Sequence, residues 1–122
     1  VKILGQGLSV FMGTVDSPDI LVILADFFLR VHNVSWDLVS GLHDDKLIVI
    51  FRGDGLRRDM GKMASQMFGD LGNAGGHRSM ARAEIPLNKL ERTHPQQFIW
   101  QRLGDYRKKK MGKTGNGRLE QK

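Results

Sequence analysis

Apolar positions recur along the chain with two spacings, one typical of helices and one typical of strands. From residue 18 to residue 31 they recur every three or four positions, which predicts an amphipathic helix. Asp16 or Ser17 can cap this helix and Pro18 suits its first turn, so we expect it to begin here and to end near residues 33–34. Its apolar face, which we expect to lie in the core, consists of Ile20, Leu24, Phe27, Phe28 and Val31.

Short runs of mixed or apolar residues between turn signals predict four strands. They cover residues 8–15, 35–42, 46–52 and 83–87. The third run is apolar at nearly every position, as expected for a central strand that is covered on both faces. Only His43-Asp44-Asp45 separates the second run from the third, which predicts an antiparallel hairpin.

Two more helices complete the pattern. One is expected from about Asp59 to Phe68, where methionines and a phenylalanine recur at helical spacing before Gly69. The last is expected to open at Thr93, which has capping-box spacing to Gln96. Its apolar side consists of Phe98, Ile99, Leu103 and Tyr106. The order of elements predicts a single α/β domain, with one mixed β-sheet of four to five strands and helices packed on it.

Composition narrows the class of protein. The chain has 122 residues, of which 40% are hydrophobic, and this fits one globular domain. No apolar run approaches the 18 residues of a membrane span, so we expect no membrane segment. The absence of cysteine excludes a thiolate nucleophile and a zinc–thiolate site, and a cytoplasmic location is the simplest expectation.

The net charge of +6 belongs to the end of the chain. Residues 107–122 hold seven basic side chains and one acidic one, so residues 1–106 carry no net charge. We therefore expect a folded domain at 1–106 and a basic C-terminal tail at 107–122, with the last helix fraying beyond about Lys108. Such a tail adds salt-dependent affinity for nucleic acid, or is simply a solvated terminus.

A glycine corner beside basic residues is the main candidate for chemistry. Gly75 and Gly76 stand directly before His77 and Arg78, and Arg52 ends the most apolar strand. Ligands of open α/β sheets bind at strand ends, and glycine lets backbone N–H groups approach a phosphate closely. Arginine and histidine add charge-assisted donors. The pattern predicts half of a phosphate-binding pocket, and a helix end followed by solvated arginines is the structural alternative.

The stretch RGDGLRRDMGKMASQMFGDLGNAGGHRSMARAEIPL resembles the DHH-associated domain, the C-terminal module of DHH phosphoesterases. These enzymes include RecJ-like exonucleases, oligoribonucleases, cyclic-dinucleotide phosphodiesterases and exopolyphosphatase-like proteins. The resemblance covers about residues 8–87 and is also clear in VDSPDILVILADFFLRV and in IVIFR. It implies that the phosphate and the sugar or base end of a substrate are held by Arg52, Gly75, Gly76 and His77, with Arg78 as a neighbour.

The chain departs from the pattern of that family at several positions. Ala74 stands at the usual third glycine, Phe51 at a frequent serine, and Met80-Ala81-Arg82 at a common Ala-Ala-Gly. The Asp-His-His motif of the N-terminal catalytic domain, which holds two manganese ions, is absent. We therefore expect neither a catalytic residue nor a metal or cofactor site in this chain, and no hydrolysis by it alone.

Three functions remain open on the sequence. The first is the substrate-binding part of a longer manganese-dependent phosphoesterase, since the chain begins without methionine. Its partners would be an N-terminal DHH domain and a short nucleic acid, nucleotide or other phosphoester. The second is a nucleic-acid-binding module without hydrolase activity, because a related domain occurs in alanyl-tRNA synthetases. The third is a scaffold that forms a homodimer.

Overall fold

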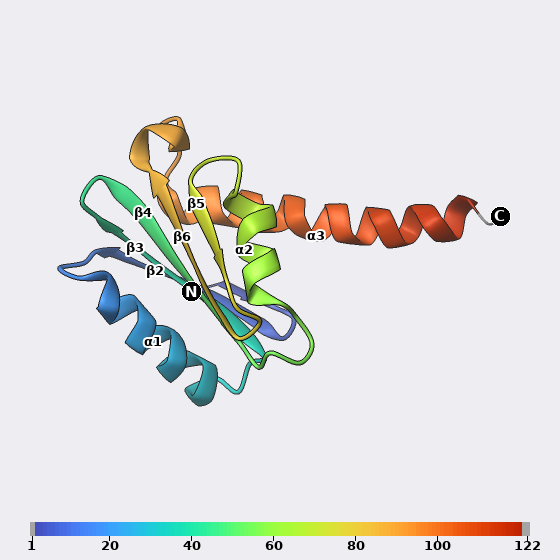
Figure 1. Cartoon of the computed structure of the whole chain (residues 1–122), viewed down its shortest axis with the longest axis horizontal. Helices are drawn as coiled ribbons and strands as arrows, with labels where there is room; N and C mark the ends of the chain where they lie inside the picture. The colour runs from blue at the N-terminus through green and yellow to red at the C-terminus, as the bar shows by residue number, and fades with distance from the viewer. Residues whose placement is uncertain (1, 121–122) are drawn as a thin grey trace.

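The computed structural model describes residues 2–120, with side chains through Lys110. It confirms the α/β fold: one mixed six-stranded sheet carries helix α1 on one face and helices α2 and α3 on the other (Figure 1). The elements are β1 Lys2–Leu4, β2 Gly7–Thr14, α1 Pro18–Val31, β3 Trp36–His43, β4 Lys46–Gly53, α2 Met60–Phe68, β5 Asn73–Gly76, β6 Met80–Pro86, a 3-10 turn at Leu87–Leu90, and α3 Pro95–Glu120.

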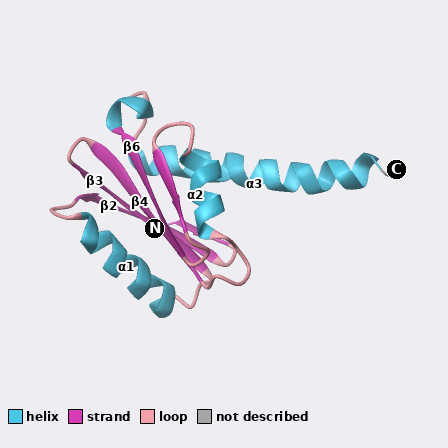
Figure 2. Ribbon diagram, viewed as in Figure 1, coloured by secondary structure: helices cyan, strands magenta, loops and turns pink. Residues whose placement is uncertain are grey.

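The strands follow the order β1-β2-β3-β4-β6-β5, and only β2 and β3 run parallel (Figure 2). Two of the six strands, β1 and β5, were not expected. Each lies at an edge of the sheet and has only three or four residues, so no alternation of apolar and polar positions can mark it. Three of the other strands lie within one residue of their predicted bounds, and β6 begins at Met80, three residues before the predicted start.

The predicted hairpin between β3 and β4 is confirmed. Asp44 and Asp45 form its turn with φ of 49° and 59°, as a two-residue turn with matching twist requires. This turn sets the register of the two strands, and the register places Asp37 of β3 directly opposite Arg52 of β4.

Helix α1 begins and ends as predicted, but its buried face is only partly the expected one. The Ser17 side chain caps it by accepting a hydrogen bond from the Asp19 N–H at 3.2 Å. Leu21 and Ala25 are fully buried, whereas Ile20, Phe27 and Val31 are 41%, 48% and 58% exposed. The helix is apolar almost all round, so the spacing of its apolar residues did not determine which side would face the sheet.

The larger core lies between the sheet and helices α2 and α3. Helix α2 matches its prediction: Asp59 caps it through the Lys62 N–H at 3.1 Å, and its methionines and Phe68 are buried. All four expected apolar residues of α3 are buried, Phe98, Ile99, Leu103 and Tyr106.

The ends of α3 differ from the expectation. The ring Nδ1 of His94, and not Thr93, accepts a hydrogen bond from the Gln96 N–H at 3.1 Å. Helix α3 continues to Glu120 and does not fray near Lys108. No proline follows Pro95, and the glycines in this segment weaken a helix without breaking it. Residues 121–122 of the predicted tail lie outside the described residues. None of the helices described is long and apolar enough to cross a membrane.

Candidate functional site

The predicted site residues meet at one end of the sheet, where β4 and β5 end and β6 begins. Arg52 pairs with Met80, and Gly75 pairs with Arg82. Because directly paired residues share a face and side chains alternate along a strand, Arg52, Arg82 and Gly75 lie on the same face of the sheet as α1. Helix α1 packs on β3 and β4, so it leaves the β6 and β5 part of this face without a helix.

Arg52 is held between α1 and β6. Its Nη2 forms an ion pair with Asp26 Oδ1 of α1 at 3.4 Å, and its Nη1 contacts the Met80 sulfur at 3.6 Å. Asp26 also pairs with Arg30, one turn further along α1, at 3.0 Å. The Arg52 Nε is buried and has no hydrogen-bond partner among the described residues. The Arg52 side chain is about one-third exposed, and its guanidinium is held in place while one of its donors stays unpaired.

Asp37 is a functional candidate that the sequence analysis missed. It is fully buried, and neither carboxyl oxygen has a hydrogen-bond partner in the described part of the chain. Burial raises the pKa of Asp37 to about 8. The positive charge of Arg52 lowers this pKa in part, and the negative charge of Asp26 raises it further. At neutral pH Asp37 is therefore mostly protonated and leaves the Arg52 charge available for an anion. A lone acid inside the run WDLVS was the available signal.

The glycine corner is part of a strand hairpin and not a helix end. The His77 N–H donates to the Met80 carbonyl at 2.7 Å and closes the turn between β5 and β6. Gly76 has φ of +153°, and a Cβ there would lie 2.6 Å from the Ala81 Cα, so this position requires glycine. A Cβ on Gly75 would meet nothing within 4 Å, so this glycine borders open space.

The same turn also supports the start of α2. The carbonyls of Arg78 and His77 accept hydrogen bonds from the Met60 and Gly61 N–H groups at 2.9 Å and 2.8 Å. A Cβ on Gly61 would come within 2.6 Å of the Gly76 oxygen. These two N–H groups of α2 are thus bound to protein carbonyls, and any anion at this corner would be bound by other groups.

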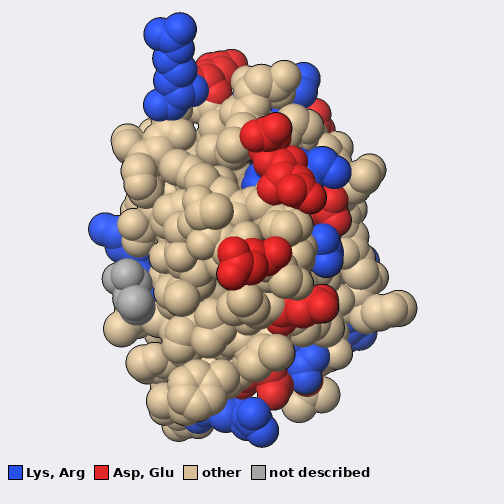
Figure 3. All heavy atoms as spheres, turned by 90° about the vertical axis from the view of Figure 1, so that its left-hand side faces the viewer, with Lys and Arg blue, Asp and Glu red and all other residues tan. Residues whose placement is uncertain are grey.

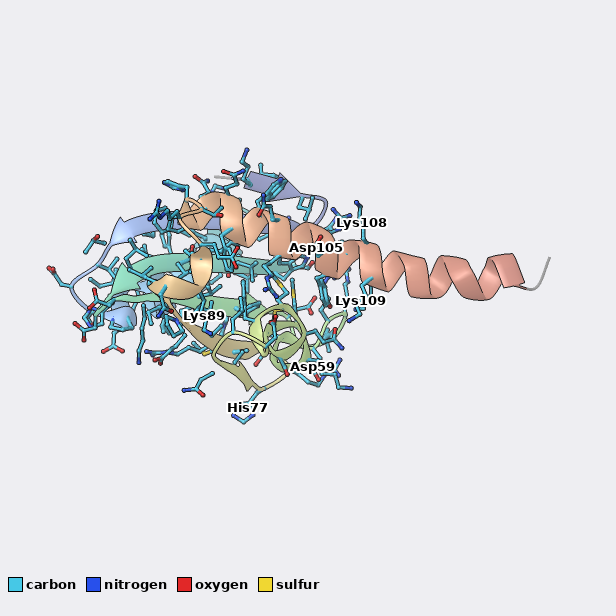
Figure 4. All side chains as sticks on the ribbon, turned by 90° about the horizontal axis from the view of Figure 1, so that it is seen from above. Asp59, His77, Lys89, Asp105, Lys108 and Lys109 are labelled. Carbon is cyan, nitrogen blue, oxygen red and sulfur yellow. The ribbon has the colours of Figure 1, made fainter. Side chains whose placement is uncertain are left out.

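The two basic residues after Gly76 face different surroundings. His77 is exposed and projects outward from the hairpin turn (Figure 4). The Arg78 guanidinium donates to the carbonyls of Gly55 and Leu56 at 2.9 Å and 3.3 Å and pairs with Asp59 at 3.6 Å. Arg78 therefore stabilises the loop before α2. Arg52, Gly75 and Gly76 lie at the strand ends, and His77 lies at the outer border of this region.

A second set of hydrogen bonds stabilises the loop between β4 and α2. Asp54 accepts hydrogen bonds from the backbone N–H groups of Leu56 and Arg57 at 2.9 Å and 3.2 Å. These two donors lower the pKa of the Asp54 carboxyl. Asp54 thus stabilises the loop that directly follows Arg52 and the end of β4.

The described residues do not form a metal site. Nowhere within residues 2–110 do three histidine or acidic side chains gather as ligands. His43 contacts the Val15 carbonyl with Nδ1 at 3.2 Å and Asp44 with Nε2 at 3.3 Å, so its place is in the hairpin turn. The manganese ligands that the DHH resemblance assigns to another domain are not supplied here, and the residues present do not fit such a centre.

A cavity of about 680 Å³ lies between α2 and α3, on the face of the sheet opposite to Arg52. Arg102 on its wall donates to the Met67 carbonyl and to Asp70, at 3.0 Å and 2.9 Å. Asp105 and Lys109 of α3 also border it (Figure 4). Sequence reasoning did not find this cavity, because its walls come from two helices about 35 residues apart.

Comparison with known proteins gives a fold but no family. No family model matches the chain. Over 77 residues, 63% of the chain, it is 32% identical to an uncharacterized protein of Methanocaldococcus jannaschii. The chain spans 15% of the length of that relative.

Two solved structures resemble this one. The C-Ala domain of Aquifex aeolicus alanyl-tRNA synthetase aligns with a TM-score of 0.55 and 15% identity, over 75% of this chain and 89% of that one. A pGpG-specific phosphodiesterase from Vibrio cholerae aligns with a TM-score of 0.44 and 13% identity, over 66% and 28%, and supports no conclusion here. The chain thus shares the fold of the C-Ala domain.

Proposed function

We propose that this chain binds the phosphate-bearing end of a short nucleic acid or related phosphoester, as the C-terminal substrate-binding domain of a longer DHH phosphoesterase. One observation carries the proposal: Arg52 is positioned at the end of β4 with its Nε unpaired, on the same face of the sheet as the open backbone of Gly75 across β6. A protonated Asp37 beneath the guanidinium does not neutralise its charge, and Asp26, the acid that the guanidinium pairs with, is shared with Arg30. The DHH resemblance assigns Arg52 and Gly75 to substrate binding independently of the structure.

Within the proposed site each residue has a distinct role. Arg52 offers a planar fork of donors to a phosphate, which then competes with Asp26 for the guanidinium. The Gly75 backbone lets the ligand approach closely because no side chain covers it. His77 donates from the exposed border of the site to the sugar or base end. Gly76 and Arg78 hold the turn and loop that position these groups.

Hydrolysis belongs to a domain outside this chain. The described residues bring no set of metal ligands together, and the DHH resemblance places two manganese ions in an N-terminal domain. The chain alone should therefore not cleave a short oligoribonucleotide in the presence of manganese. Cleavage that persists after repurification and is abolished by a chelator would contradict this assignment.

Binding is tested by titration of the chain with a 5′-mononucleotide. Loss of one charge-assisted hydrogen bond costs about 1.5–3 kcal/mol, so Arg52→Gln and His77→Ala should each weaken binding roughly tenfold or more. Arg92→Gln, in the loop before α3 at the other end of β6, is the matched control and should bind as the wild type does. Unchanged affinity in Arg52→Gln, with unchanged thermal stability, would refute the proposal.

A second function is favoured by the exposed basic side chains Arg107, Lys108 and Lys109 on α3. A module that binds nucleic acid without any hydrolase partner would use these residues for contacts to the phosphate backbone. The two functions differ in one measurement. Full-length protein with manganese should degrade RNA, DNA, a cyclic dinucleotide or polyphosphate under the first, and bind nucleic acid without turnover under the second.

A further inference from the structure

The outer face of α1 carries an apolar stripe that nothing in the described chain covers. It consists of Ile20, Ile23, Phe27 and Val31, which are 41%, 68%, 48% and 58% exposed. At 100° per residue these four positions fall within an arc of about 80°. The helix faces the sheet through Leu21 and Ala25 on the opposite side, so the stripe points directly to solvent.

Figure 3 looks onto the side of the molecule that carries α1. Uncharged side chains cover much of this surface, above all in the left half of the view, whereas acidic side chains run down its middle and right side and basic ones lie mostly around its border. Grouped exposed side chains of this size mark an interaction site, since scattered single apolar residues are the usual pattern on a surface.

The charges of α1 line one edge of the stripe and change sign along it. Asp19 lies in the first turn and Arg30 in the last turn. Asp26 lies between them, but Arg30 and Arg52 of the same chain compensate its charge. The stripe therefore has an acidic start and a basic end on the same side of the helix.

We propose that this stripe is the interface of a homodimer, in which the α1 helices of two copies pack antiparallel about a two-fold axis. An isologous contact requires a surface that complements itself after a half turn. In antiparallel packing Ile23 of one copy lies beside the partner's Phe27. The charged edge of one helix lies beside the charged edge of the other, and the two edges run in opposite directions. Asp19 of each copy therefore lies next to the partner's Arg30.

A second copy fits the stripe better than a membrane or a nucleic acid does. A helix that lies on a membrane carries several lysines or arginines on its polar side, whereas α1 has one arginine and two aspartates. Nucleic acid would meet an apolar surface with acidic groups on its edge. The contact is a single pair of helices, so the dimer should be weak, with a dissociation constant in the micromolar range, on the order of 1–100 μM.

Sedimentation velocity of the full chain, from about 1 μM to about 1 mM, tests the proposal. The wild type should pass from the mass of one chain to twice that mass. Ile23→Glu should stay monomeric, and Leu56→Glu should dimerise as the wild type does, since Leu56 is apolar and 82% exposed but lies outside the stripe. Thermal unfolding of both variants checks that they fold.

The antiparallel arrangement makes a sharper prediction. Asp19→Arg alone and Arg30→Glu alone each bring like charges together at both ends, so each should weaken dimerisation at least tenfold. A mixture of these two single variants restores opposite charges at both ends and should form a heterodimer. A monomeric wild type at about 1 mM, full dimerisation of Ile23→Glu, or a mixture no better than its components would overturn the proposal.

Discussion

Replacing Asp37 by asparagine should abolish much of the pH dependence of stability between pH 4 and pH 8. In the unfolded chain this carboxyl titrates near its ordinary value of 3.8, whereas in the folded protein its pKa is about 8. Between these values the folded state binds one more proton than the unfolded state. The free energy of unfolding therefore falls as the pH rises through this window and is level above it.

The magnitude follows from the two pKa values. Each unit is worth about 1.4 kcal/mol, so the full window corresponds to at most roughly 6 kcal/mol, and the part between pH 5 and pH 8 to about 4 kcal/mol. The asparagine side chain has nearly the same size as the aspartate it replaces and stays neutral, so the Asp37→Asn variant loses this term. The variant should be more stable than the wild type at pH 8, and the two should have similar stability near pH 4.

Urea unfolding of both proteins at several pH values between 4 and 9 measures the effect. The difference between the two free energies of unfolding isolates Asp37, because the two proteins share every other ionisable side chain. Parallel pH profiles would show that Asp37 is ionised in the folded protein and would refute the account of its burial. The pH profile of mononucleotide affinity gives a second reading: above pH 8 the wild type should lose affinity, and Asp37→Asn should not.

Three further outcomes are expected. Leu21→Ala should destabilise the domain by about 2–5 kcal/mol, whereas Ile20→Ala should stay within about 1 kcal/mol; equal losses in chemical denaturation would mean that the stripe of α1 is buried. Gly76→Val should cost about 2 kcal/mol or more through strain in the turn, and Gly75→Ala should leave the melting temperature near that of the wild type. Removal of residues 107–122 should change the melting temperature by about 2 °C or less and should reduce the salt dependence of nucleic-acid binding. Loss of cooperative unfolding in the shortened chain would show that these residues are part of the folded domain.

Features that depend on neighbouring residues in the chain were predictable from the sequence. Ser17 and Asp59 cap their helices because a cap acts within three residues of its partner. The hairpin at Asp44 and Asp45 was predictable because a two-residue connection leaves two strands no choice but antiparallel pairing. The place of Arg52 at a strand end followed from the predicted strand 46–52, whereas the sequence placed Gly75 only in a corner before a strand.

Other features were decided only when the elements packed together. Which side of α1 is buried depended on the shape of the sheet surface, which accepts Leu21 and Ala25 and leaves Ile23 in water. The raised pKa of Asp37 depends on apolar neighbours from other elements, and Arg78 found its acceptors in a loop 22 and 23 residues earlier. Local sequence determines where elements begin and end, because caps and turns act over a few residues. Burial and the pairing of distant charges arise from contacts between elements, so only the tertiary structure could decide them.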